Sequence, residues 1–373
     1  MNTRLAIRWR HAAAVLLLAA GGAAAETPAR HPVSIGQSAA LSTPQAAQSH
    51  AFLQGARLYF DRVNAGGGVH GRPIELRTLD DGGDPARAAA NTRRFLDEGV
   101  LSLFGYAGTG AVDAAHPAAR HAGAVLFAPL SGDDELRGPN YPQVFALRPS
   151  YGDEMLAVAR HARLAAARRF LILHTDDAES LAALRAARQV LRELGLEPVA
   201  VSLQQSGLPA AIDKALAPGV DAVVVVADPR GSAVAVRYLR VRHYGGPVYA
   251  LSTAGEDLLA RDIGEDAAGV IATRLVPRAA VAHTVSAREL MTDAARLDVV
   301  PNAYMMEGYI AARVLAGALQ AAGPNPTRER LKQALEAMRD IDAGGFPVRF
   351  RKDRTASHAV ELTFIDAKGR LRE

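Results

Sequence analysis

Short runs of β-branched and aliphatic residues alternate along most of the chain with longer stretches whose apolar residues recur at helical spacing. The first part of this pattern predicts four strands, at 33–36, 74–79, 101–104 and 125–127. The pattern then begins again and predicts four more, at 170–174, 199–203, 222–226 and 248–251. Alternating strands and helices are typical of parallel sheets covered by helices. We therefore predict two similar α/β lobes.

The hydrophobic pattern changes after residue 269. One further strand is predicted at 269–274, and three helical stretches follow at 284–297, 301–322 and 327–339. Two strand-like pieces, at 347–350 and 360–365, end the pattern. Helices without strands of their own must pack on an existing sheet, so we expect the chain to return to the first lobe.

These elements predict an α/β fold of two doubly wound parallel-sheet lobes joined by a three-strand hinge. Residues 31–147 and 278–345 would form the first lobe, and residues 148–277 and 346–373 the second. The expected crossovers are 147–150, 276–278 and 346–350. Lobes connected in this way can hinge around a cleft.

The composition narrows the class of protein. Of 373 residues, 49% are hydrophobic and 22% are charged, which excludes a disordered chain and a polytopic membrane protein. The formal charge of +4, from 43 basic and 39 acidic residues, does not indicate a nucleic-acid partner. Cysteine is absent, so the chain has no disulfides, no thiolate metal site and no cysteine to carry a lipid.

Residues 1–25 have the layout of a secretory signal peptide. Arg4, Arg8 and Arg10 precede the apolar run 12–20, and small residues at 23–25 predict cleavage before Glu26. Nine apolar residues are too few to cross a bilayer core, which needs about 20. We therefore expect export to the periplasm without direct membrane insertion.

Two glycine- and aspartate-rich segments fail as cofactor or metal motifs. The glycines of 66–71 satisfy G-x-G-x-x-G, but a helix precedes them and a strand follows, which reverses the order that a dinucleotide site needs. The aspartates of 80–84 lack the alternate oxygens and later glutamate of a calcium loop, and Asp84 before Pro85 is better explained as a helix cap. The histidines are scattered. No metal and no cofactor is predicted.

A candidate binding site follows the third and fourth predicted strands. Ligands collect at the carboxyl ends of the strands in open α/β sheets, where a helix N-terminus offers free N–H groups to a carboxylate. The candidate residues are Tyr106, Gly108 and Thr109 in the first loop and Leu130, Ser131 and Gly132 in the second. Ordinary tight turns are the alternative explanation of these loops.

Three residues of the second lobe are candidates to close on the same ligand. Asp176, Asp228 and Thr253 each follow a predicted strand. Asp228 before Pro229 is equally well explained as a helix cap. A hydrolase built on Ser131 and Asp133 is the enzymatic alternative. Because no base adjoins that serine and the strand-to-helix elbow of a nucleophilic serine is missing, we expect no catalytic residue and no enzyme.

From about residue 31 onward, the sequence resembles the leucine/isoleucine/valine-binding family of periplasmic solute-binding proteins that feed ABC transporters. The resemblance lies in the blocks 53–60, 64–71, 104–109, 307–312 and 344–348. It implies two doubly wound lobes joined by three crossovers, in agreement with the pattern above.

The resemblance also implies roles for individual residues. Thr109, with Leu130, Ser131 and Gly132, would hold an α-carboxylate and an α-ammonium, and a residue near Gln48 would flank the ligand. The second lobe departs from the family. Ala178-Glu179-Ser180 stands where many members carry an aromatic residue, and neutral Ser252 and Thr253 stand where an acid often pairs with the ammonium. Either Asp228 or Asp176 takes that role, or the ligand lacks an amino group.

We therefore predict a monomeric periplasmic substrate-binding protein of an ABC importer. Its ligand would be a small carboxylate-bearing solute, foremost an amino acid of the branched-chain type, and its partner an inner-membrane ABC permease. A sensing module for a signalling partner, or a binder of another carboxylate or an amide, is the alternative.

Overall fold

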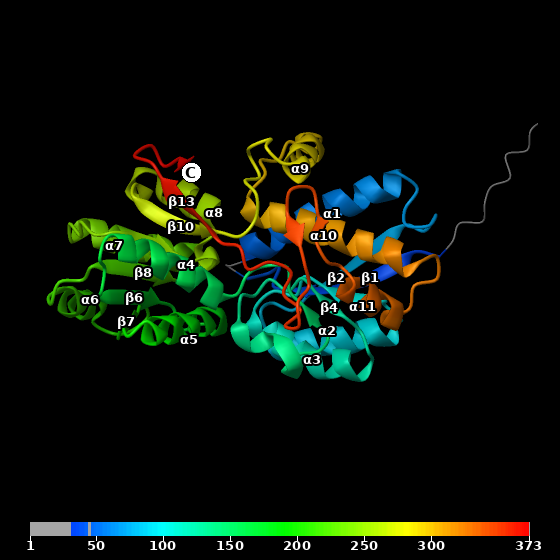
Figure 1. The fold of residues 1–373 in the computed structure, drawn as a ribbon, viewed down its shortest axis with the longest axis horizontal. Coiled ribbons are helices and arrows are strands. Elements are labelled where there is room, and N and C mark those ends of the chain that lie inside the picture. Colours follow the sequence, from blue (N-terminus) through cyan, green and yellow to red (C-terminus); the bar gives the residue numbers. More distant parts are fainter. Residues whose placement is uncertain (1–30, 44–45, 373) are drawn as a thin grey trace, which may run out of the picture.

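The computed structural model describes residues 31–43 and 46–372. They form two α/β lobes side by side, as Figure 1 shows. The two-lobe α/β fold expected from the sequence is confirmed. The predicted signal peptide, residues 1–25, lies outside the described residues.

The first lobe is built on a five-stranded parallel sheet with the order β2-β1-β3-β4-β5. Its strands are β1 (Val33–Ala39), β2 (Ile74–Asp80), β3 (Ser102–Phe104), β4 (Leu126–Phe127) and β5 (Val144–Phe145). Its first helices are α1 (Ala46–Ala65), α2 (Pro85–Asp97) and α3 (Thr109–His121), and two 3₁₀ turns lie at Asp134–Leu136 and Gly138–Asn140. The predicted cap is present, because the Asp84 side chain accepts a hydrogen bond from the Ala86 N–H at the start of α2.

The second lobe is built on a seven-stranded sheet with the order β14-β13-β10-β9-β8-β6-β7. Five of these strands are parallel: β6 (Phe170–His174), β7 (Val199–Ser202), β8 (Ala222–Val226), β9 (Val248–Ala250) and β10 (Val270–Arg274). The helices are α4 (Tyr151–Leu164), α5 (Ala178–Glu193), α6 (Leu208–Leu216), α7 (Pro229–Val241) and α8 (Glu256–Ile263), with 3₁₀ turns at Ser252–Ala254 and Gly264–Ala267.

The last two strands make this sheet mixed. β13 (Glu361–Ile365) runs antiparallel to β10, and β14 (Leu371–Arg372) runs antiparallel to β13. Glu361, the first residue of β13, pairs with Arg274, the last residue of β10. Because the returning chain enters this lobe beside the point where it left, it must run in the opposite direction. The sequence pattern assigned no direction to this last strand, and the structure makes this edge of the sheet antiparallel.

Strand residues alternate between the two faces of each sheet and fill separate cores. In β8, Val223 and Val225 pack in the cluster that contains Val236 of α7, whereas Val224 and Val226 pack in the cluster that contains Leu184 of α5. All five residues of β8 are buried. A strand covered by helices on both faces needs no polar alternation, which explains the valine run.

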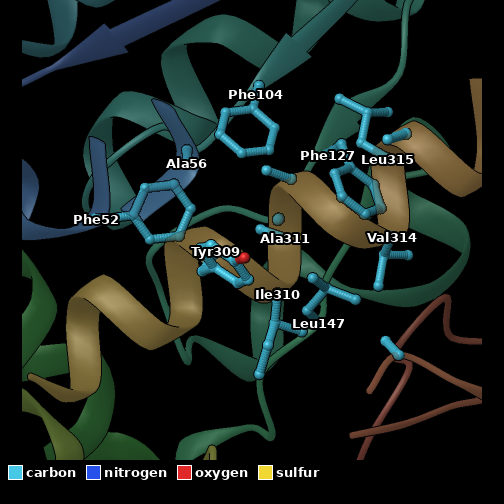
Figure 2. Packing of buried hydrophobic residues seen from close by; sticks show 14 of the residues in the cluster. Phe52, Ala56, Phe104, Phe127, Leu147, Tyr309, Ile310, Ala311, Val314 and Leu315 are labelled. Atoms are coloured by element: carbon cyan, nitrogen blue, oxygen red, sulfur yellow. The ribbon is translucent and has the colours of Figure 1, made fainter. Parts of the chain in front are cut away.

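The late helical block packs on the first lobe, as the sequence predicted. It consists of α9 (Val285–Ala295), α10 (Ala303–Ala322) and α11 (Arg328–Glu336), and α10 lies alongside α1 in Figure 1. Figure 2 shows Ile310 and Val314 of α10 in the same core as Phe104 and Phe127 of the sheet. Residues far apart in the sequence thus complete one hydrophobic core.

The predicted third crossover at 346–350 is wrong. This segment lies in the first lobe, where β12 (Pro347–Val348) pairs with β11 (Ile341–Asp342) and the Phe350 ring lies 5.3 Å from that of Phe145. Thr355 still pairs with Ala146 next to β5. Because the aromatic and aliphatic residues of this segment fill the core of the first lobe, the chain passes to the second lobe between Thr355 and β13.

Two glycines allow α1 and α10 to approach each other closely. A Cβ atom added to Gly308 would lie 1.9 Å from the Phe52 carbonyl oxygen, and one added to Gly55 would lie 1.9 Å from the Met305 carbonyl oxygen. Both obstacles are backbone atoms, which cannot rotate away as a side chain could. Any larger residue must therefore separate the two helices and open the core beneath them.

Gly308→Ala is expected to lower the free energy of unfolding by about 2 kcal/mol or more, because the helices must move apart. The matched control is Gly317→Ala in the same helix, where the added Cβ would find only the end of the Met338 side chain, at 3.8 Å. The control should be neutral or slightly stabilising, since alanine favours a helix by about 1 kcal/mol over glycine. Urea unfolding of the two variants measures the difference, and equal stabilities would contradict this account of the contact.

Candidate cleft between the lobes

The carboxyl ends of the parallel strands in both sheets face the space between the lobes. In the first sheet β1 lies between β2 and β3, and in the second β6 lies between β7 and β8. The chain therefore turns to opposite sides after successive strands in both sheets. Loops that diverge in this way leave a crevice at the carboxyl ends of the strands. The two crevices face each other.

A cavity of about 450 Å³ lies between these loops. Its first-lobe lining includes Thr43, Gln48, Gly108, Thr109 and Leu130, and its second-lobe lining includes Thr175, Asp177, Glu179, Asp228 and Thr253. Its volume falls in the range of pockets that hold small organic ligands, about 300–1,000 Å³.

Most of the predicted site residues lie at this cavity. Gln48, Gly108, Thr109, Leu130, Asp228 and Thr253 all line it. The Ser131 hydroxyl lies 3.1 Å from the Thr109 hydroxyl, in the side-by-side arrangement expected from neighbouring strands. Asp228 also caps α7 by accepting a hydrogen bond from the Gly231 N–H. Its position is therefore compatible with both interpretations, a ligand contact and a helix cap.

Four predicted residues do not line the cavity: Ser131 and Gly132, which lie in the loop behind Thr109, and Tyr106 and Asp176, which point elsewhere. Tyr106 is fully buried between α2 and α3, where its hydroxyl lies 2.9 Å from that of Thr92. Asp176 is exposed and accepts a hydrogen bond from Ser202 at the end of β7. Tyr106 was predicted from its place in the loop, but its side chain points into the core. Asp176 follows β6 but turns toward the outer strand.

The loop before α3 presents Thr109 to the cavity. Gly108 has φ +89°, a conformation that glycine adopts without strain, and it forms the N-cap of α3. Thr109 is therefore the first residue of the helix, and its N–H has no partner within the helix. This N–H and the Thr109 hydroxyl point the same way, and both meet one acceptor.

That acceptor is a carboxylate of the protein itself. Glu179 Oε2 accepts a hydrogen bond from the Thr109 N–H at 2.6 Å and from the Thr109 hydroxyl at 2.9 Å. The other carboxylate oxygen accepts a hydrogen bond from the Tyr151 hydroxyl. Burial, together with the nearby Glu179 charge, raises the pKa of Tyr151 well above its ordinary value, so its hydroxyl keeps its proton and donates. Glu179 thus occupies the donors that the sequence assigned to the ligand's carboxylate.

Gly132 contributes by its small size. A Cβ atom at this position would lie 2.7 Å from the Tyr151 ring, and the Gly132 carbonyl accepts a hydrogen bond from the Tyr151 N–H at 2.8 Å. Because residue 132 has no side chain, the Tyr151 ring can pack against this loop and its hydroxyl can reach Glu179.

Other hydrogen bonds join the lobes around the cavity. The Gln48 amide donates to the Thr253 carbonyl at 2.8 Å and to the Tyr304 hydroxyl at 2.8 Å. The Tyr304 hydroxyl donates in turn to the Ser252 carbonyl at 2.7 Å. Arg185 of α5 lies 3.3 Å from Asp133 and 3.4 Å from Glu135 in the first lobe. The structure is therefore that of a closed cleft, held by polar contacts from both sides.

Some polar atoms at the cavity have no hydrogen-bond partner. Among the described residues, buried side-chain atoms without a partner include the Thr43 hydroxyl, the Thr253 hydroxyl and Arg148 Nε, all from residues that line the cavity. Thr253 is only 8% exposed. Burying an unpaired hydroxyl costs about 1–3 kcal/mol, so a partner for any of these atoms would recover free energy.

A buried ion pair ties the first crossover to α10. Arg148 Nη2 lies 3.1 Å from Glu307 Oε1, and both side chains are almost completely buried. Glu154 nearby accepts hydrogen bonds from the Ser252 N–H at 2.8 Å and the Ser252 hydroxyl at 2.6 Å. Burial is the largest single effect and lowers the pKa of Arg148, but Glu307, Tyr151, Tyr304 and Glu154 together raise it by more, so the net shift is upward. The guanidinium at the hinge stays charged.

Other kinds of site find no support in the part of the chain that the structure describes. No group of three or more acidic, histidine or cysteine side chains there could hold a metal ion. No helix in residues 31–43 and 46–372 is long and apolar enough to span a membrane. The Ser131 hydroxyl contacts the Thr109 hydroxyl and accepts a hydrogen bond from the Asp133 N–H. These contacts fix the loop and do not make the serine a nucleophile.

The fold and its cleft are those of a bilobed binding protein. The model of the periplasmic binding protein family matches residues 32–370, and the chain belongs to this family, whose members are substrate-binding proteins. This confirms the resemblance inferred from the sequence.

Three solved structures are similar over most of the chain. One is an extracellular ligand-binding receptor from Verminephrobacter eiseniae, with 21% identity, a TM-score of 0.84 and coverage of 92% of this chain and 100% of that one. A substrate-binding periplasmic protein from Ralstonia solanacearum has 29% identity and a TM-score of 0.82, and the match covers 91% and 99% of the two chains. A possible leucine/isoleucine/valine-binding protein from Rhodopirellula baltica has 26% identity and a TM-score of 0.79, with 92% and 97% covered. No curated protein matches the chain.

Sequence reasoning missed four residues that shape the cavity: Arg148, Tyr151, Glu179 and Tyr304. Glu179 was noticed only as a departure from the family pattern. A glutamate in the first turn of a helix normally serves that helix, so nothing local to Glu179 indicates that it bonds to Thr109.

Glu307→Gln is expected to lower the free energy of unfolding by about 3 kcal/mol, because it leaves the buried Arg148 cation without its charged partner. Replacing both residues, as Arg148→Met with Glu307→Leu, should restore much of the loss, since no charge then remains buried. The control is Glu336→Gln, whose partly exposed ion pairs with Lys332 and Arg354 should contribute less than about 1 kcal/mol each. Urea unfolding compares the variants, and a loss for Glu307→Gln no larger than the control's would contradict the assignment.

Proposed function

We propose that this protein is the solute-binding component of an ABC importer and that it holds a small organic solute in the cleft between its lobes. The observation that carries the proposal is the cavity of about 450 Å³ at the carboxyl ends of both sheets. Buried hydroxyl and guanidinium atoms without partners belong to its lining. Membership of the periplasmic binding protein family supports the same role.

Binding would act by favouring the closed arrangement of the lobes. A solute in the cavity touches loops of both lobes at once, and it can do so only when the cleft is closed. Its binding energy therefore shifts the population toward the closed form, without any chemical change in the solute. The hydrogen bonds from Gln48 and Tyr304 to the second lobe add to the closed state.

The partner in this proposal is an inner-membrane ABC permease, which would receive the solute from the closed form in the periplasm. The predicted signal peptide and the family both support this location. We propose a monomer, since each lobe completes its own core within one chain.

The amino-acid ligand predicted from the sequence meets an obstacle at Thr109. The donors assigned to an α-carboxylate are bonded to Glu179, so an amino acid would have to displace that side chain. The proposed function does not depend on this point, because the cavity remains with Glu179 in place.

The cleft is tested by identifying what it holds. Mass spectrometry of small molecules released when the purified protein is denatured should reveal a bound solute. Adding that solute at 100 times its dissociation constant should stabilise the protein by about 2.7 kcal/mol in a thermal-unfolding experiment. A protein that releases no solute, and whose melting temperature no small organic compound raises, would refute the proposal.

Thr253→Val is expected to weaken binding of this solute roughly tenfold, because the valine cannot make the hydrogen bond that the free Thr253 hydroxyl offers. The free energy of unfolding without solute should stay the same or rise slightly, since the variant removes an unpaired buried hydroxyl. Thr292→Val on the exposed surface of α9 is the control and should leave the affinity unchanged. Isothermal titration measures both, and an unchanged affinity in Thr253→Val would exclude this hydroxyl from the site.

A further inference from the structure

The Glu179 carboxylate lies between the first turns of two helices that belong to different lobes. It is the second residue of α5, and it accepts hydrogen bonds from the N–H and hydroxyl of Thr109, the first residue of α3. The N-terminal end of a helix carries a partial positive charge. One carboxylate thus neutralises two positive helix ends that would otherwise face each other across the cleft.

The donors around this carboxylate are fully used. Thr109 provides two of them, and the buried Tyr151 hydroxyl provides a third. A solute carboxylate at the same place would have to expel Glu179 or lie beside it. Two carboxylates that share one set of donors repel each other, so a closed cleft that keeps Glu179 in place disfavours an anionic group there.

The rest of the cavity is acidic. Three carboxylates belong to its lining, from Asp177, Glu179 and Asp228. The cation among the described lining residues is Arg148, whose charge is balanced by Glu307 at 3.1 Å. A cavity with surplus negative charge attracts a cation and repels an anion.

A separate observation is that one lining residue carries a polar group without a hydrogen-bond partner. The Thr253 hydroxyl, on a residue more than nine-tenths buried, has no hydrogen-bond partner. Thr253 comes from the loop after β9, on a different strand from the one that leads to Glu179. The lining of the cavity thus contains an unpartnered hydroxyl as well as the three carboxylates.

We propose that Glu179 determines the specificity of the cleft: it takes the place of a ligand carboxylate on Thr109, so that the protein binds a basic solute, an amine or a guanidine, that carries no carboxylate. This inference rests on the proposed function, since it names the class of solute for the same cleft. Glu179 fills the anion site from within the protein. The solute's cationic nitrogen meets the acidic lining.

Matched pairs of probes that differ only by a carboxylate test this inference. Each pair is an amino acid and its decarboxylated amine: L-leucine and 3-methylbutylamine, L-phenylalanine and phenethylamine, L-arginine and agmatine, L-lysine and cadaverine. Isothermal titration measures the affinity of the full-length mature protein for each probe. The wild-type protein should bind at least one amine, more than tenfold tighter than the parent amino acid.

Two variants of Glu179 separate its charge from its size. Glu179→Gln keeps the shape but removes the charge, and it should weaken amine binding at least tenfold. Glu179→Ala also frees the Thr109 N–H and hydroxyl, so it should bind the parent amino acid more tightly than the wild-type protein does. An amine preference that survives in both variants would overturn the inference.

The control variant is Glu135→Gln. Glu135 is an exposed carboxylate that pairs with Arg185 across the lobes at 3.4 Å, away from the cavity. If it loosens the closed form, it should change the affinities for an amine and its amino acid by the same factor. A Glu135→Gln variant that reversed the preference as Glu179→Gln does would show that lobe closure, not the Thr109 site, sets the specificity.

The identity of the solute released on denaturation keeps the two proposals apart. A basic compound without a carboxylate supports the inference. A released carboxylic acid, or a wild-type protein that binds an amino acid more tightly than its amine, overturns the inference and leaves the proposed function standing. If no solute is released and no probe binds, the inference fails, and the proposed function fails with it only when no other small organic compound raises the melting temperature.

Discussion

The hydrogen bond from the Thr109 N–H to the Glu179 carboxylate joins the first turn of a helix in one lobe to the first turn of a helix in the other. It forms because Gly108 turns the chain into α3 and because Asp177 caps α5 two residues before Glu179. Tyr151 then holds the other carboxylate oxygen, from a helix that begins directly after the first crossover. This contact therefore helps to close the cleft, and it fixes the position of one of the carboxylates that line it.

The helices that enter late in the chain complete the core of the first lobe. α10 packs against α1 across glycines and reaches the same core as the central strands (Figure 2). The same helix carries Tyr304 to the cleft and Glu307 to Arg148 at the hinge. A single well-packed element therefore supports both the binding surface and the connection around which the lobes would move. This arrangement suits a member of the periplasmic binding protein family, because two lobes joined by a hinge can close around a cleft.

Local sequence patterns were sufficient for most of the elements. The valine run of β8 predicted a strand buried on both faces, and Asp84 with Pro85 predicted the start of α2. Both features depend on neighbouring residues along the chain, where periodicity and capping act. The segment with Phe346 and Phe350 was assigned to the wrong lobe, because a strand-like pattern does not tell which core it fills. The direction of β13 could not be predicted from the sequence pattern either, because it depends on where the chain re-enters the second lobe.

The sequence by itself determined the two-lobe α/β class and the loop that carries Thr109, because these follow from periodicity and glycine positions, and its local motifs carried the resemblance to the family. It placed Gln48, Thr109, Leu130, Asp228 and Thr253 in the candidate site, and the structure brings them to one cavity. Only the tertiary structure decided that Tyr106 points into the core and that Glu179 faces Thr109. These two residues lie 70 positions apart and belong to different lobes. Their contact depends on how two separately folded sheets face each other, which no local pattern encodes.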